Sequence, residues 1–139
     1  MMIELAYGQN SIPVDLPQHH LQEIVWPREF PGLSADTNLV QQALRFPKNS
    51  PTLSELVRLK SARSAVIVVN DITRPTPYQE ILPPLLDELT GTGIDKENII
   101  LLIATGIHRP QTEEENQLVF GPDICSQYRI VNHDCDRDL

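Results

Sequence analysis

The chain has 139 residues, and its 19 acidic and 11 basic side chains give a formal net charge of −8. This length fits one domain that can bury a core without disulfides. The charge disfavours a nucleic-acid partner, because domains that bind nucleic acids usually carry a basic surface. The longest uninterrupted apolar run, residues 99–104, is too short to cross a membrane. Cys125 and Cys135 match no zinc-binding spacing, so we expect two free thiols, a reducing cytoplasmic setting and no metal site.

Residues 1–51 contain six of the twelve prolines and are predicted to form a β-hairpin followed by irregular chain and short helices. Apolar and polar residues alternate over 3–7 and 12–16, on either side of a turn at 8–10. Farther along, the apolar spacing over 36–46 predicts an amphipathic helix.

Residues 52–139 are predicted to form a core of alternating helices and strands. Capping-box sequences predict helices that begin at Thr52 and Thr112. A third helix is expected over residues 78–89, kinked or split by the adjacent prolines 83 and 84.

Three buried strands are expected between these helices, over 65–69, 98–104 and 127–131. This alternation predicts an α/β fold with an open, mainly parallel sheet. We expect the sheet to be doubly wound, with helices on both faces and the N-terminal hairpin at one edge.

Each predicted strand is followed by a polar loop, and these loops supply the candidate site. Loops at the carboxyl ends of parallel strands share one edge of the sheet, where doubly wound folds bind ligands. We therefore expect the chemistry-bearing residues of the three loops to lie close together. They are Asp71, Thr73 and Arg74 in the first loop, Thr105, Gly106, His108 and Arg109 in the second, and His133 in the third.

These residue types favour a small anionic ligand. Arginine suits a carboxylate or phosphate, and threonine hydroxyls and helix N-termini add neutral donors. Gly106 lets the backbone approach a ligand closely, and His108 is the acid–base candidate because imidazole moves protons near neutral pH. Structural readings remain open: Asp71 can bond its own loop backbone, and Arg74 can be a surface ion-pair partner.

The motifs DITRPTP (71–77), ATGIHRP (104–110) and NHD (132–134), in this order and spacing, resemble the N-terminal domain of the nickel-dependent lactate racemase family. The resemblance implies a nickel-pincer nucleotide cofactor and inversion of C2 of a 2-hydroxy acid by proton-coupled hydride transfer. It implies that His108 is a catalytic histidine that takes and returns the hydroxyl proton. Arg74 would orient the substrate carboxylate, with Arg109 assigned to the same task. Cofactor contacts are implied for Asp71, Thr73, Thr105, Gly106 and His133.

The chain departs from that family in length. It lacks the downstream glycine-rich segment with the second catalytic histidine, the lysine that bonds the cofactor and the nickel-binding histidine. We therefore expect residues 1–139 to be the N-terminal part of a longer racemase-like protein, inactive alone. Its expected partners are a small carboxylate metabolite and the missing downstream domain, and apolar surface left by that domain would favour a homodimer or aggregation.

Two other functions are considered. The chain can be a non-catalytic module that binds small anions, or a split subunit that works only with a partner. A phosphohydrolase that uses Asp71 is less favoured, because Thr73 stands where such enzymes place a second acid.

Overall fold

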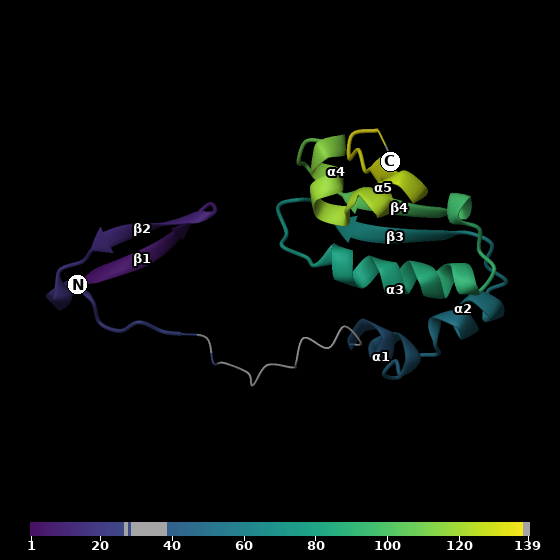
Figure 1. Cartoon of the computed structure of the whole chain (residues 1–139), viewed down its shortest axis with the longest axis horizontal. Helices are drawn as coiled ribbons and strands as arrows, with labels where there is room; N and C mark the ends of the chain where they lie inside the picture. Colours follow the sequence, from purple (N-terminus) through teal and green to yellow (C-terminus); the bar gives the residue numbers. More distant parts are fainter. Residues whose placement is uncertain (27, 29–38, 138–139) are drawn as a thin grey trace. The chain divides into compact units, whose positions relative to one another are not determined.

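The computed structural model describes residues 1–26, 28 and 39–137, and chain contacts divide the molecule into two compact units, residues 1–35 and 36–139. Each unit has a sheet of its own (Figure 1). Within the described part of the chain, no helix is long and apolar enough to cross a membrane.

The first unit contains the expected hairpin. β1 (Met2–Tyr7) pairs antiparallel with β2 (Asn10–Asp15), and Tyr7 stands opposite Asn10. Gly8 has a φ of +60°, the conformation that a tight two-residue hairpin turn with glycine at its first central position requires. The hairpin is a separate two-stranded sheet, whereas the sequence suggested extra strands at the edge of the parallel sheet.

The second unit contains the parallel α/β sheet, which confirms the predicted fold class. Its strands are β3 (Ala65–Asn70), β4 (Ile99–Ala104) and β5 (Arg129–Asn132), in that spatial order. Its helices are α1 (Leu39–Arg45), α2 (Leu53–Leu59), α3 (Tyr78–Gly91), α4 (Glu113–Phe120) and α5 (Pro122–Gln127). Two short 3₁₀ turns, η1 (Gln18–His20) and η2 (Lys96–Asn98), complete the described elements. Helix α1 belongs to the second unit, so the boundary between the units lies at residues 35 and 36 and not at the end of the proline-rich segment 1–51.

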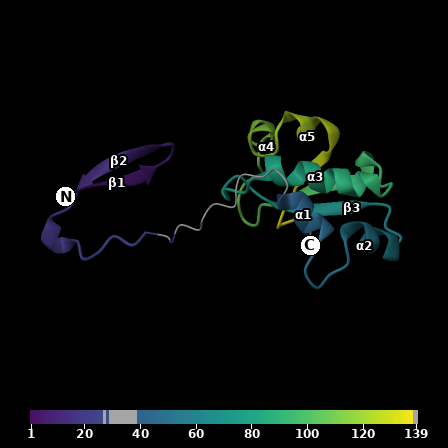
Figure 2. The same ribbon diagram turned by 60° about the horizontal axis from the view of Figure 1, so that its bottom comes forward.

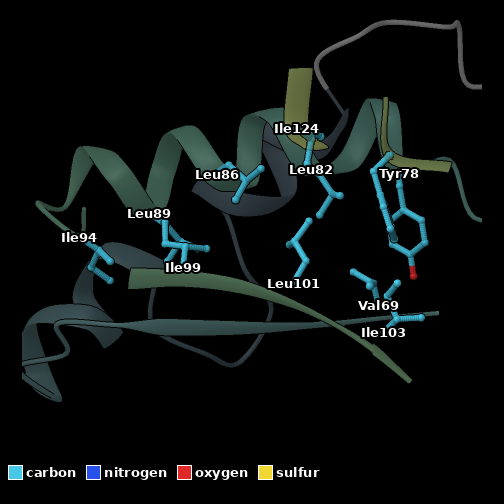
Figure 3. Packing of buried hydrophobic residues seen from close by; sticks show 11 residues of the cluster. Val69, Tyr78, Leu82, Leu86, Leu89, Ile94, Ile99, Leu101, Ile103 and Ile124 are labelled. Carbon is cyan, nitrogen blue, oxygen red and sulfur yellow. The ribbon is translucent and has the colours of Figure 1, made fainter. Parts of the chain in front are cut away.

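The core lies between one face of the sheet and α3. Every second residue of β3 and β4 points toward this helix, as the pleat of a strand requires (Figure 3). Leu82 and Leu86 of α3 are 1% and 2% exposed. The buried cluster consists of Val69, Tyr78, Leu82, Leu86, Leu89, Ile94, Ile99, Leu101, Ile103, Phe120 and Ile124.

The opposite face of β3 is open among the described residues, so the predicted second helix layer is not found there. Val66 and Val68 are 57% and 67% exposed. Strands β3, β4 and β5 follow one another in space as they do in sequence. Right-handed crossovers that step in the same direction place their helices on the same face, and a helix on the other face requires a reversal of strand order.

Helix α3 runs through both of its prolines, so the predicted split at this point is wrong. Pro83 and Pro84 lie inside a 14-residue helix. They remove the amide bonds to the carbonyls of Gln79 and Glu80, but both of these residues are exposed and water can satisfy them. Burial of the leucine face against the sheet then holds the helix in one piece.

The capping boxes and the helix pair near the C-terminus position the last loops. Both predicted capping boxes are confirmed, at Thr52 with Glu55 and at Thr112 with Glu115. Helix α5, which the sequence analysis missed, lies beside α4 in both views (Figures 1 and 2). Its signal was Gly121–Pro122: the glycine has a φ of +88° and the proline begins the next helix.

Candidate active site

The three polar loops leave the sheet at the same edge, as predicted. In the parallel registers, Asn70 of β3 stands beside Ala104 of β4, and Ile103 stands beside Asn132 of β5. The loops that begin at Asp71, Thr105 and His133 therefore start side by side, although 62 positions separate the first residue from the last.

Asp71 and His108 form the central contact of this edge. Oδ2 of Asp71 lies 2.5 Å from Nδ1 of His108. The aspartate side chain is 8% exposed, whereas the histidine side chain is 53% exposed. A buried carboxylate thus supports an imidazole that faces solvent.

The second oxygen of Asp71 is bonded within its own loop. Oδ1 accepts hydrogen bonds from the Thr73 hydroxyl at 2.6 Å and the Thr73 amide at 3.2 Å. The loop is a turn closed by the Arg74 amide, which donates to the Asp71 carbonyl. The hydroxyl of Thr73 and the ring of His108 hold the pKa of Asp71 below its ordinary value. The alternative that Asp71 bonds its own loop backbone therefore describes Oδ1, whereas Oδ2 contacts His108 of the second loop.

The state of Asp71 decides which tautomer His108 adopts. A carboxylate can only accept hydrogen bonds, so the proton of the 2.5 Å contact belongs to Nδ1 of the imidazole. In neutral His108 the lone pair is then on Nε2. Nε2 bonds to none of the described residues, which leaves it able to take a proton from a ligand.

Thr105 and His133 join the second and third loops through the backbone. The Thr105 hydroxyl donates 2.5 Å to the His133 carbonyl, and the His133 amide donates to the Ile103 carbonyl. The Thr105 carbonyl accepts from the His108 amide. Since Thr105 is 2% exposed, its hydroxyl serves to hold the loops together and is not open to a ligand.

Gly106 presents an open stretch of backbone in the second loop. Its φ is +58°, which disfavours any side chain. A Cβ at this position would meet nothing within 4 Å. The glycine is therefore required by the turn, and it leaves room for a ligand against the main chain.

The two loop arginines differ in what they contact. Arg109 forms a two-pronged pair with Glu115 at 2.6 and 2.9 Å. Its partner in the structure is therefore a carboxylate of the chain itself, whereas the resemblance assigned it to the substrate carboxylate. This pair and the Thr112 amide lower the pKa of Glu115 to about 2. Arg74 lines a shallow groove with Pro77 and Leu118, and its guanidinium has no hydrogen bond or ion pair within the described residues.

Two buried polar side chains that were not among the predicted site residues, Gln111 and Tyr78, support these loops. Gln111 is 5% exposed and bonds to Ile72 and Asn132. The Tyr78 hydroxyl accepts a 2.5 Å hydrogen bond from the Asn70 amide. Their spacing carries no pattern signal. A polar residue just before the capping threonine was the only local cue for Gln111.

The described residues do not fit the metal-holding part of the cofactor that the family resemblance implies. Among residues 1–26, 28 and 39–137, no group of three His, Cys, Asp or Glu side chains could hold a metal ion. Lys96 bonds to Gln127 and precedes β4, at the edge of the sheet opposite the loops. The polar atoms of Asp71 and Thr105 already have partners.

Comparison with known proteins agrees with the arrangement of these loops. Residues 7–139 match the family model of the lactate racemase N-terminal domain. The lactate racemase of Thermoanaerobacterium thermosaccharolyticum is 34% identical over 134 residues, which cover 95% of this chain and 31% of that protein. The lactate racemase of Lactiplantibacillus plantarum is 39% identical over 133 residues, covering 94% of this chain and 31% of that protein.

A solved structure extends the match to the fold. The lactate racemase apoprotein from Thermoanaerobacterium thermosaccharolyticum has a TM-score of 0.76 and 32% identity to this chain, over 96% of this chain and 30% of that one. The chain thus spans about a third of the length of the curated relatives it matches. On the family match, the shared fold and the three strand-end loops together, the chain belongs to the lactate racemase N-terminal domain family.

Proposed function

We propose that this chain supplies a proton-transfer group and a carboxylate-binding arginine to a racemase of 2-hydroxy acids. The 2.5 Å contact between Asp71 and His108 carries the proposal, because it fixes the histidine tautomer and directs the lone pair away from the buried carboxylate. An Asp–His pair of this kind orients a general base and stabilises its protonated form.

In this role His108 takes the proton of the substrate hydroxyl at Nε2 and later returns it. The carboxylate of Asp71 stabilises the imidazolium that forms in between, without accepting the proton itself. The guanidinium of Arg74, which no described carboxylate neutralises, binds the substrate carboxylate in a two-pronged geometry. The open backbone at Gly106 leaves space for the ligand.

The role proposed for this chain is limited to the proton and to the substrate carboxylate. The nickel of a nickel-pincer nucleotide would be held by residues outside the described part of this chain, because no described group of side chains fits a metal. A covalent lysine bond would also come from elsewhere, because Lys60 and Lys96 precede β3 and β4 at the edge opposite the loops and Lys48 lies before α2. For the same reason we propose that the 139-residue chain does not turn over substrate alone.

The test is racemisation of D- and L-lactate by a complete, cofactor-loaded racemase that contains this domain. His108→Ala removes the base and should lower kcat by about 10²–10⁴-fold, whereas Arg74→Ala should raise KM through loss of the carboxylate contact. His20→Ala is the matched control, because His20 is an exposed histidine of the hairpin unit. Wild-type turnover in His108→Ala contradicts the assignment.

The phosphohydrolase alternative finds no support in the loop. Both oxygens of Asp71 are engaged by Thr73 and His108, and residues 72–77 contain no second acid for magnesium. Magnesium-dependent phosphatase activity that Asp71→Asn abolishes would reverse this preference.

A further inference from the structure

Gln111 is a buried residue of the second loop that bonds both to the first loop and to the end of β5. It is 5% exposed, and its side-chain oxygen accepts a 2.7 Å hydrogen bond from the Ile72 amide in the first loop. Its side-chain amide donates 2.9 Å to Asn116 of α4. Its backbone exchanges two hydrogen bonds with the Asn132 side chain at the end of β5, at 2.8 and 3.1 Å.

We propose that Gln111 is a positioning residue for the acid–base pair: its carboxamide oxygen holds the Ile72 amide so that the Asp71 carboxylate stays against His108. Ile72 lies between Asp71 and Thr73, inside the turn that the Arg74 amide closes. The β3–β4 register brings this turn beside the second loop, and the turn's own hydrogen bonds fix its shape. The bond from Ile72 to Gln111 then ties the turn directly to the loop that carries His108.

The anchoring of Gln111 makes it suited to this task. Asn132 fixes its backbone to the end of β5, and Asn116 orients its side chain so that the oxygen faces Ile72. Because hydrogen bonds are directional, a side chain of similar size that lacks the carboxamide cannot replace Gln111. Gln111 thereby links the first loop to the end of β5 and to α4.

A purely structural role would have a different signature. A buried amide with satisfied hydrogen bonds stabilises the fold wherever it lies, and its loss would then lower stability without changing the Asp71–His108 contact in folded molecules. Positioning instead predicts a local change in the folded state. The inference rests on the proposed function only for the catalytic meaning of the pair. Its readouts need no racemase activity, so failure of either idea is seen separately.

The experiment is an NMR titration of the Asp71 carboxyl carbon in the 139-residue chain, together with hydrogen exchange of the Ile72 amide. Gln111→Leu keeps the volume and removes both polar functions. Gln79→Leu is the matched control, because it removes a glutamine bond to the Leu118 carbonyl outside the loop cluster.

In folded Gln111→Leu we expect faster exchange at Ile72 and a rise in the Asp71 pKa, since contact with His108 helps to hold it low. Gln79→Leu should leave both unchanged. If Gln111→Leu does not fold, Asn116→Ala carries the test, because it frees the Gln111 amide and should produce the same changes. An unchanged Asp71 titration in the folded variant, or an equal change in Gln79→Leu, overturns the proposal.

Discussion

Replacing Asp71 by asparagine tests the hydrogen-bond logic of the candidate site at a single atom. Asp71 accepts from Thr73 through one oxygen and from His108 through the other. An asparagine has one acceptor oxygen and one donating amide. If its oxygen keeps the two Thr73 donors, its amide faces Nδ1 of His108 and must donate to it. The imidazole then carries its proton on Nε2 and loses the basic lone pair on the exposed side.

The size of the effect follows from what is removed. The substitution changes neither the volume of residue 71 nor the two bonds from Thr73, so the fold should persist. What is lost is the proton-accepting form of His108, and a positioned general base contributes about 10²–10⁴-fold to a rate. We expect a loss of kcat of that order in the complete, cofactor-loaded racemase, approaching the loss in His108→Ala.

Two measurements check this prediction. The ¹⁵N chemical shifts of the His108 ring report the tautomer in the 139-residue chain, and we expect Nδ1–H in the parent and Nε2–H in Asp71→Asn. Lactate racemisation by the complete enzyme gives the rate. Asp123→Asn, an exposed substitution in the first turn of α5, is the control. An unchanged His108 tautomer in folded Asp71→Asn would refute the reasoning.

Three further outcomes follow from the described contacts. Glu115 has an ordinary pKa of 4.5 and a folded pKa of about 2, so the stability that it contributes is complete above pH 4.5 and is lost as the pH falls toward 2. Glu115→Gln should therefore reduce the fall in the free energy of unfolding over that pH range. Urea unfolding that gives the same dependence of this free energy on pH as in the parent would contradict the prediction. Leu86→Ala, at a 2% exposed core position, should cost about 2–5 kcal/mol in urea unfolding, whereas a loss well below 1 kcal/mol would show that the site is not packed. Gly106→Ala meets open space but keeps a φ of +58°, so it should cost about 1–2 kcal/mol, and an unchanged midpoint of urea unfolding would show that the turn relaxes.

The strand-end loops were predictable because their placement depends only on the order of elements. Once the apolar runs at 65–69 and 98–104 are identified as parallel strands, their following residues must share an edge. The capping threonines were equally predictable, since Thr112 and Glu115 are linked by a local hydrogen-bond pattern. Both signals are contained in short stretches of chain.

The partners of the loop side chains were not predictable, because they depend on how each loop meets the next structural element in space. Arg109 could reach a ligand or Glu115, and only the start of α4 brings the glutamate within 2.6 Å. Gln111 and Asn132 lie 21 positions apart and meet because β5 ends beside α4. The placement of the described helices on one face of the sheet likewise depends on strand order, which alternating elements do not determine by themselves.

The groups that have no partner among the described residues define what, in the proposed function, this domain contributes to inversion of a stereocentre. Racemisation needs proton transfer at two faces of the substrate, so one fixed imidazole serves one face. Among the described histidines of the loops, His108 has a carboxylate that sets its tautomer, whereas the His133 ring has no hydrogen bond or ion pair within the described residues. The guanidinium of Arg74 has no ion pair among the described residues, while that of Arg109 is paired with Glu115. In the proposed function, the oriented base, the guanidinium of Arg74 that no described group neutralises and the open backbone at Gly106 serve one face of the substrate. We therefore propose that the second proton-transfer group lies outside the described residues.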